Sequence, residues 1–168
     1  MSIATILLFL GAAAIGTNIL LATIHRNHDG PIELESVLGS RIDSLLKESP
    51  ELASWARLRS ERGTSWALYV FRTDCPACTS QKAQMAASFR ALPKARFVTS
   101  SPEEHETIDD YWHSALPSPI HVSQAALREL GVPGVPALLI ISPANIVQEA
   151  WLGVVTSWPP KSIQSRLE

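Results

Sequence analysis

The sequence predicts an α/β fold in which a mixed β-sheet is covered by helices on both faces. Three observations support this prediction. A continuous apolar run, Trp66–Phe71, is typical of a strand buried on both faces. A segment of helical character, Ala77–Leu92, follows it closely. Two further apolar strands, Ala137–Ser142 and Val147–Leu152, are separated by a turn of hairpin length.

The overall composition fits one globular domain. The chain has 168 residues, of which 46% are hydrophobic and 18% are charged, and this excludes a disordered chain. Lys and Arg number 14 against 16 Asp and Glu, so the formal net charge is −2. This balance offers no electrostatic attraction to nucleic acid, and we expect no nucleic-acid partner.

The N-terminal segment has the length and apolarity of a membrane span. No charged side chain occurs from Ile3 to Ile24. As a helix this segment would rise about 33 Å, enough to cross a hydrocarbon core. We therefore predict that residues 1–28 form an N-terminal transmembrane anchor. A cleaved signal peptide is the alternative, but no basic residue precedes Ile3 and the small-residue cleavage site is poor.

Residues 29–63 are predicted to form a juxtamembrane helical segment. Apolar residues recur at helical spacing over Ile32–Lys47, which predicts a helix there. This stripe is too short for a coiled coil, so we expect it to pack on the domain or on a neighbouring membrane subunit. Ser49 and Pro50 have the types preferred at the N-cap and first position of a second helix, and Gly63 lies just past its end.

Residues 64–168 are predicted to form the main domain. Besides the elements named above, this region is expected to contain two more strands and three more helices. The strands are Ala95–Thr99 and Pro119–Val122, and the helices are an acidic one over Pro102–Leu116, one over Ser123–Gly131, and a closing one over Thr156–Glu168.

The two cysteines of the chain stand three residues apart, where the strand Trp66–Phe71 gives way to a helix. The motif is Cys75-Pro76-Ala77-Cys78. A cysteine at a helix N-terminus is favoured as a thiolate by the unpaired amides and the helix dipole. The second cysteine, one turn further along, is close enough to attack a mixed disulfide formed on the first. The pattern predicts a redox-active pair.

Other interpretations of the cysteines are weaker. Two inert buried cysteines would be expected at unrelated spacings. A zinc site would need two more ligands, and the candidates are His105, Asp109 and His113 on one face of the acidic helix. Because this helix carries several other acidic residues, a solvated polar face explains the pattern more simply. We therefore predict no metal site.

A second motif lies just before an apolar strand. It is the glycine- and proline-rich segment Gly131–Ala137. Pro136 at the strand entrance is tolerated because the first residue need not donate to the sheet, and its surroundings also suit a cis peptide bond. Taken alone, an ordinary loop would explain this segment equally well.

Together these features resemble the thioredoxin superfamily. The resemblance runs from about Trp66 to the C-terminus and rests on the strand Trp66–Phe71, the Cys-Pro-Ala-Cys motif with its helix, and Gly131–Ala137. The acidic insertion Glu103–Leu116 and the segment His121–Gly134 are similar to membrane-anchored TlpA-like proteins. The Thr-Asp-Cys-Pro-Ala-Cys run behind an N-terminal anchor is also similar to MauD-like proteins.

The resemblance implies a role for each motif. Cys75 would be the accessible nucleophile and Cys78 the buried resolving thiol. Pro136 would be the cis-proline opposite the pair, and Val135 would offer backbone hydrogen bonds to an extended substrate. The implied activity is thiol–disulfide exchange with protein disulfides or dithiols, without organic cofactor or metal, and with a membrane electron donor among the partners.

The resemblance also bears on localisation. It implies a single-pass protein of the cell membrane whose soluble domain is extracytoplasmic, in the periplasm. The nearest basic residue to the span, Arg26, would by the positive-inside rule place this domain in the cytoplasm. One arginine close to Asp29 is a small bias, and we prefer the periplasmic orientation.

Three positions depart from the superfamily pattern. Asp74 stands where thioredoxins have Trp, Tyr69 where relatives have a buried Asp or Asn, and Gln81 where TlpA-like proteins have Glu. The Asp74 anion opposes a thiolate on Cys75 unless Arg72 screens it, which favours a role as a reductant. No residue can be named as the acceptor of the Cys78 proton.

Two other functions compete with this prediction. One is a non-catalytic docking or assembly subunit of a membrane complex, for which the five tryptophans would supply aromatic surface. The other is a copper or zinc chaperone, although copper-delivery relatives space their cysteines one residue further apart.

Overall fold

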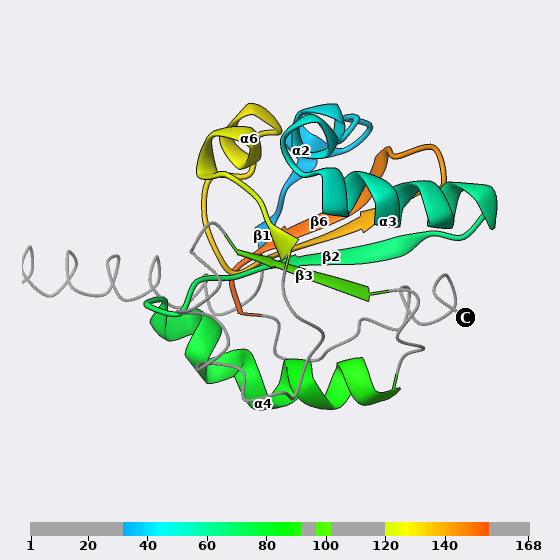
Figure 1. The fold of residues 1–168 in the computed structure, drawn as a ribbon. Helices are drawn as coiled ribbons and strands as arrows, with labels where there is room; N and C mark the ends of the chain where they lie inside the picture. The colour runs from blue at the N-terminus through cyan, green and yellow to red at the C-terminus, as the bar shows by residue number, and fades with distance from the viewer. Residues whose placement is uncertain (1–31, 92–96, 102–119, 155–168) are drawn as a thin grey trace, which may run out of the picture. The chain divides into compact units, whose positions relative to one another are not determined.

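The computed structural model describes residues 32–91, 97–101 and 120–154 (Figure 1). The predicted anchor over residues 1–28, the acidic helix with His105, Asp109 and His113, and the closing helix Thr156–Glu168 lie outside the described residues. Within the described ranges, no helix has both the length and the apolarity needed to cross a membrane.

The described residues form a mixed six-stranded sheet with the strand order β1-β6-β5-β2-β3-β4. Strand β2 pairs in parallel with β3, and β3 in parallel with β4, whereas β2–β5, β5–β6 and β1–β6 are antiparallel. The predicted mixed sheet is confirmed. Its strands are β1 (Ile32–Glu33), β2 (Trp66–Val70), β3 (Phe97–Ser101), β4 (Ile120–His121), β5 (Ala137–Ile141) and β6 (Val147–Leu152).

Helices cover both faces of this sheet (Figure 1). On one face lie α2 (Asp43–Glu48), α3 (Pro50–Glu61) and α6 (Gln124–Glu129), and on the other lies α4 (Pro76–Ala91). The α/β class predicted from the sequence is therefore confirmed, since one layer of sheet separates two layers of helix.

The core is divided by the central strands into two clusters. All five residues of β2 and of β5 are buried, as their continuous apolar runs predict. Alternate residues point to opposite faces. Leu68 and Val70 join the cluster under α2, α3 and α6, whereas Tyr69 and Phe71 join the cluster under α4. The α4 face therefore contains the surroundings of the second cysteine.

The segment before α3 does not form the single helix predicted over Ile32–Lys47. It forms β1, a short 3₁₀ helix, η1 (Glu35–Val37), and then α2. The helix is interrupted because the backbone bonds to β6 instead: the Leu34 amide donates to the Ala150 carbonyl and the Gly39 amide to the Val147 carbonyl, both at 2.9 Å. Gly39 has a φ of +78°, which an α-helix does not allow.

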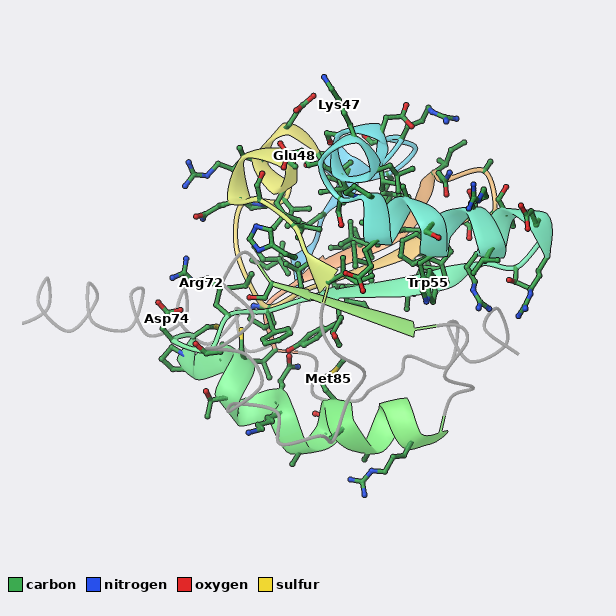
Figure 2. All side chains as sticks on the ribbon, viewed as in Figure 1. Lys47, Glu48, Trp55, Arg72, Asp74 and Met85 are labelled. Atoms are coloured by element: carbon green, nitrogen blue, oxygen red, sulfur yellow. The ribbon has the colours of Figure 1, made fainter. Side chains whose placement is uncertain are left out.

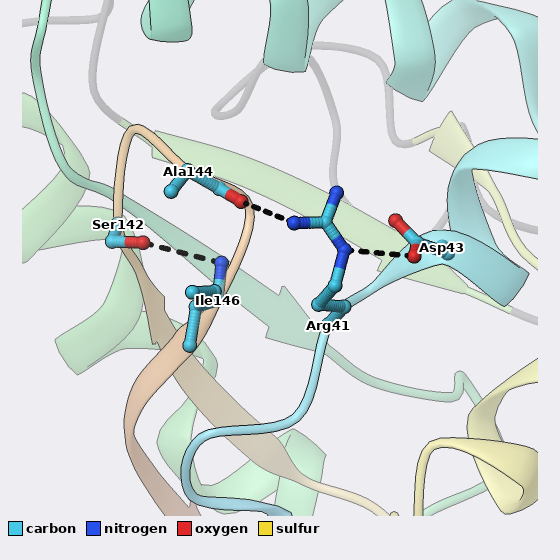
Figure 3. Close-up of polar contacts among 5 residues, drawn as sticks. All are labelled: Arg41, Asp43, Ser142, Ala144 and Ile146. Carbon is cyan, nitrogen blue, oxygen red and sulfur yellow. Dashed lines mark hydrogen bonds and ion pairs between the residues drawn. The ribbon is translucent and has the colours of Figure 1, made fainter.

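This segment packs on the domain, which was one of the two expected alternatives. Val37, Ile42 and Leu45 are fully buried in the cluster that also holds β2 and β5. Arg41 adds a polar tie to the β5–β6 hairpin (Figure 3). Its guanidinium donates to the Ala144 carbonyl at 3.4 Å and pairs with Asp43 at 2.8 Å. The hairpin turn is closed by the Ile146 amide, which donates to Ser142 Oγ at 3.2 Å.

The second helix begins and ends where the sequence predicts. The Leu52 amide donates to Ser49 Oγ at 3.3 Å, so Ser49 is the N-cap of α3, and Pro50 occupies the first position. Gly63, with a φ of +63°, follows the helix end. Ser123 caps α6 in the same way, because its Oγ accepts from the Ala126 amide at 3.1 Å. Local capping therefore sets these boundaries.

Candidate active site

The two cysteines lie at the junction between β2 and α4. Strand β2 ends at Val70, the chain turns through residues 71–75, and α4 begins at Pro76. A proline suits this first helical position because no helical carbonyl is available to its nitrogen there. Cys75 is partly buried and Cys78 is fully buried, and both are free thiols. The junction thus presents one sulfur toward solvent and places the other in the core.

Cys75 serves as the acceptor at the start of the helix. The Cys78 amide donates to Cys75 Sγ at 3.2 Å, and the Thr79 amide donates to the Cys75 carbonyl at 3.0 Å. At a helix N-cap, the side chain accepts a hydrogen bond from the backbone amide two or three residues later. Cys75 has this geometry, with sulfur in place of oxygen as the acceptor. Such a bond is stronger when the acceptor is charged, so it stabilises negative charge on this sulfur.

Cys78 lies among apolar and aromatic side chains. Tyr69, Phe71, Met85 and Ile140 belong to the same buried cluster, and Met85 points into the space between the sheet and α4 (Figure 2). Burial raises the pKa of the Cys78 thiol far above its ordinary value, and the contact with Cys75 raises it further. Cys78 is therefore a neutral thiol at physiological pH.

The glycine- and proline-rich loop comes up to the first cysteine. The Val135–Pro136 peptide bond is cis, as the surroundings of this proline suggested. Cys75 Sγ donates to the Val135 carbonyl at 3.7 Å, which joins residues 60 positions apart in the chain. Pro136 is buried and its carbonyl accepts from the Gly153 amide at 2.8 Å. The fold thus brings Cys75, Cys78, Val135 and Pro136 into one site.

Asp74, immediately before Cys75, is paired with Arg72. The guanidinium Nε and Nη2 each contact one carboxylate oxygen at 2.8 Å (Figure 2). The hydrogen bonds from Arg72 hold the pKa of Asp74 below its ordinary value. The sequence suggested that Arg72 could screen the Asp74 anion, and in the structure Arg72 makes a two-bond contact with this carboxylate. This screening offsets the argument that Asp74 favours a reductant.

Tyr69 and Gln81 are both buried, at 2% exposure each. Tyr69 lies in the cluster around Cys78 and stacks on Phe71 with ring centroids 6.0 Å apart. Gln81 lies three residues further along α4. A phenol and an amide hold these positions, so neither can accept the Cys78 proton as a carboxylate would.

A hollow that is open to solvent lies beside this site. It shares Arg72 and Val135 with the site already described. The sequence did not single out the helix residues that line it, because α6 precedes the loop and shows only an ordinary apolar pattern. The lining residues are Arg72, Gln124, Leu127, Val132, Pro133, Gly134 and Val135.

The structure adds no metal site to this picture. Among the residues that it describes, no three His, Cys, Asp or Glu side chains gather as ligands for a metal ion. The sequence alternative with His105, Asp109 and His113 falls in the segment that is not described.

Comparisons with known proteins support the fold. No family model matches the sequence, and no curated protein is similar to it. Among solved structures, a thiol-disulfide isomerase from Corynebacterium glutamicum superposes with a TM-score of 0.51 at 14% identity, covering 66% of this chain and 85% of that one. StoA from Bacillus subtilis superposes with a TM-score of 0.47 at 14% identity, covering 63% and 84% respectively. The mixed sheet, its helices on both faces and the likeness to the isomerase together show that this chain has a thioredoxin-like fold.

Proposed function

We propose that the protein is a membrane-anchored thiol–disulfide oxidoreductase that exchanges the Cys75/Cys78 pair with disulfides of protein substrates. One observation carries the proposal. The partly exposed Cys75 sulfur accepts the Cys78 amide at the start of α4, while Cys78 itself is a buried thiol one turn away. This arrangement separates a nucleophile from a resolving group, as exchange through a mixed disulfide requires.

The reaction proceeds in two steps. The Cys75 thiolate attacks one sulfur of a substrate disulfide, so that a Cys75–substrate disulfide forms and the other substrate sulfur leaves as a thiolate that takes up a proton. Cys78 then gives up its proton to solvent water and attacks Cys75 Sγ as a thiolate. The Cys75–Cys78 disulfide forms and the second substrate thiolate is released. Two electrons pass from the pair to the substrate, and the reverse sequence oxidises a substrate dithiol.

The loop before β5 positions the substrate in this proposal. The Val135 carbonyl lies 3.7 Å from Cys75 Sγ, so backbone hydrogen bonds at Val135 would align an extended substrate segment beside the nucleophile. Pro136, just before β5, has a fixed φ and no amide hydrogen to donate. The backbone hydrogen bonds to the substrate would therefore come from the neighbouring Val135. No organic cofactor or metal is needed for the exchange.

The membrane part of the proposal rests on the uncharged segment Ile3–Ile24. An anchor of this kind raises the local concentration of the domain near membrane partners, such as an electron-donating membrane protein. In a periplasmic orientation the substrate would be an extracytoplasmic redox enzyme undergoing maturation. Deletion of residues 1–30 tests the anchor, because the truncated chain should move from the membrane to the soluble fraction.

The exchange itself is tested by trapping. In cells that express the full chain, Cys78→Ser should accumulate mixed disulfides between Cys75 and partner proteins, visible as adducts on a non-reducing gel that disappear with reductant. Cys75→Ser is the matched control and should form none. Equal adducts from both variants, or none from either together with no disulfide reductase activity of the parent chain, would refute the proposal. Full biological activity of Cys75→Ser would favour a docking subunit instead.

A further inference from the structure

We propose that Arg72 is a positioning residue for the nucleophile, because it binds the Asp74 carboxylate and so removes the repulsion of that anion from Cys75. The inference rests on the proposed function in taking Cys75 as the attacking sulfur. It goes beyond it in assigning a role to the pair that precedes the cysteine.

The geometry of the pair supports this role. Both carboxylate oxygens of Asp74 are engaged by Arg72, each at 2.8 Å, in the fork arrangement that only arginine provides. Arg72 keeps 35% of its side chain exposed and Asp74 keeps 64%. Exposed pairs add little to stability, so the fold does not depend on this one. Its effect falls instead on the adjacent sulfur, which must carry a negative charge before it attacks.

Within the described ranges, charged and titratable groups meet the site from the loop before α4 and from α4. From the loop before α4 they are Arg72 and Asp74, and from α4 itself Cys78 is the group that contacts the Cys75 sulfur through its amide. The cis-proline loop presents apolar side chains and backbone at Val135. Across the hollow, α6 presents Gln124 and Leu127, and its charged Arg128 and Glu129 are exposed near its C-terminal end. Among these described residues, Asp74 is thus the carboxylate adjacent to Cys75 in the chain.

The expected size of the effect follows from Coulomb's law. In a water-like medium an unpaired carboxylate on a neighbouring residue disfavours a thiolate by roughly threefold. Lower local permittivity near the protein surface enlarges this factor, and high salt reduces it. Loss of Arg72 should therefore slow the reactions of Cys75 at neutral pH.

The test measures the reactivity of a single thiol. In full-length chains that carry Cys78→Ser, the rate of Cys75 alkylation by iodoacetamide is measured at pH 7 in low and in high salt. Arg72→Gln should slow alkylation roughly threefold in low salt and less in high salt. Asp74→Asn should react at least as fast as the parent. The double variant Arg72→Gln/Asp74→Asn should match Asp74→Asn, because no anion remains to be screened.

The double variant separates this role from other roles of Arg72. If Arg72→Gln slows alkylation equally with Asp74 and with Asn at this position, Arg72 acts on Cys75 directly and the inference is wrong. An unchanged rate in Arg72→Gln also overturns it. Arg72→Lys should restore only part of the parent rate, since lysine loses the two-bond contact. Alkylation needs no protein substrate, so these outcomes are independent of whether the chain proves to be an oxidoreductase.

Discussion

The Cys78 amide donates a hydrogen bond to Cys75 Sγ at 3.2 Å, although the two side chains differ in burial. The acceptor sulfur is partly exposed at the start of a helix, whereas the Cys78 sulfur is enclosed by aromatic and aliphatic groups. One helical turn thus separates a sulfur that accepts an amide hydrogen bond from a buried sulfur on which charge is disfavoured. This difference has consequences for stability as well as for reactivity.

The raised pKa of Cys78 predicts a loss of stability at alkaline pH. Folded Cys78 keeps its proton, whereas the unfolded thiol ionises near pH 8.5, so the unfolded state binds fewer protons above that pH. The free energy of unfolding should therefore fall above about pH 8.5, by up to about 1.4 kcal/mol per pH unit from this group. Urea unfolding under reducing conditions at pH 7, 8, 9 and 10 measures the effect.

Cys78→Ala is the control for this prediction, because it removes one ionisable thiol and keeps all others. The stability difference between the parent chain and this variant should be constant up to about pH 8 and should shrink above it. A difference that stays constant up to pH 10 would show that folded Cys78 ionises like an unfolded thiol.

Local sequence signals predicted much of the fold and the site. Ser49, Pro50 and Gly63 mark the limits of α3, and the two cysteines lie at the strand-to-helix junction where the sequence placed them. Such features depend on residues close together in the chain, so they can be predicted from the sequence. The sequence also suggested the cis bond before Pro136, which the structure contains.

Long-range contacts account for what the sequence did not predict. The pairing of Ile32 with Leu152 depends on residues far apart in the chain, and it converts a helical pattern into a strand and a turn. The hollow beside Arg72 depends equally on how α6 packs near the end of β2. The two-bond contact between Arg72 and Asp74 depends on the orientation of both side chains, which their spacing in the sequence does not determine.

The cluster around Cys78 should be sensitive to loss of volume. Ile140 is fully buried in this cluster, so Ile140→Ala should lower the free energy of unfolding by about 2–5 kcal/mol. The cavity should also increase the reaction rate of Cys78 with a maleimide in Cys75→Ser chains. Leu58, on α3, is 43% exposed, and Leu58→Ala should change stability by less than about 0.5 kcal/mol. Equal losses from the two variants would contradict the assigned core.

Two glycines with left-handed backbone offer a matched test of how the N-terminal segment is held. Gly131 has a φ of +92°, and a Cβ placed there would lie 3.1 Å from Val37 Cγ1. Gly39 has a φ of +78°, but a Cβ there would meet no atom within 4 Å. Alanine should cost about 1–2 kcal/mol at either position for its backbone conformation. At Gly131 the contact with Val37 should add about 1 kcal/mol more.

Urea unfolding of Gly131→Ala and Gly39→Ala measures this difference directly. The excess at Gly131 would show that residues 35–37 pack tightly against the end of α6, from which the chain continues to Val135 and Pro136. In that case Gly131→Ala should also slow disulfide exchange, because the displaced loop carries the Val135 carbonyl that contacts Cys75. Equal losses of stability in the two variants would mean that Val37 yields freely, so that the N-terminal segment does not support the loop of the site.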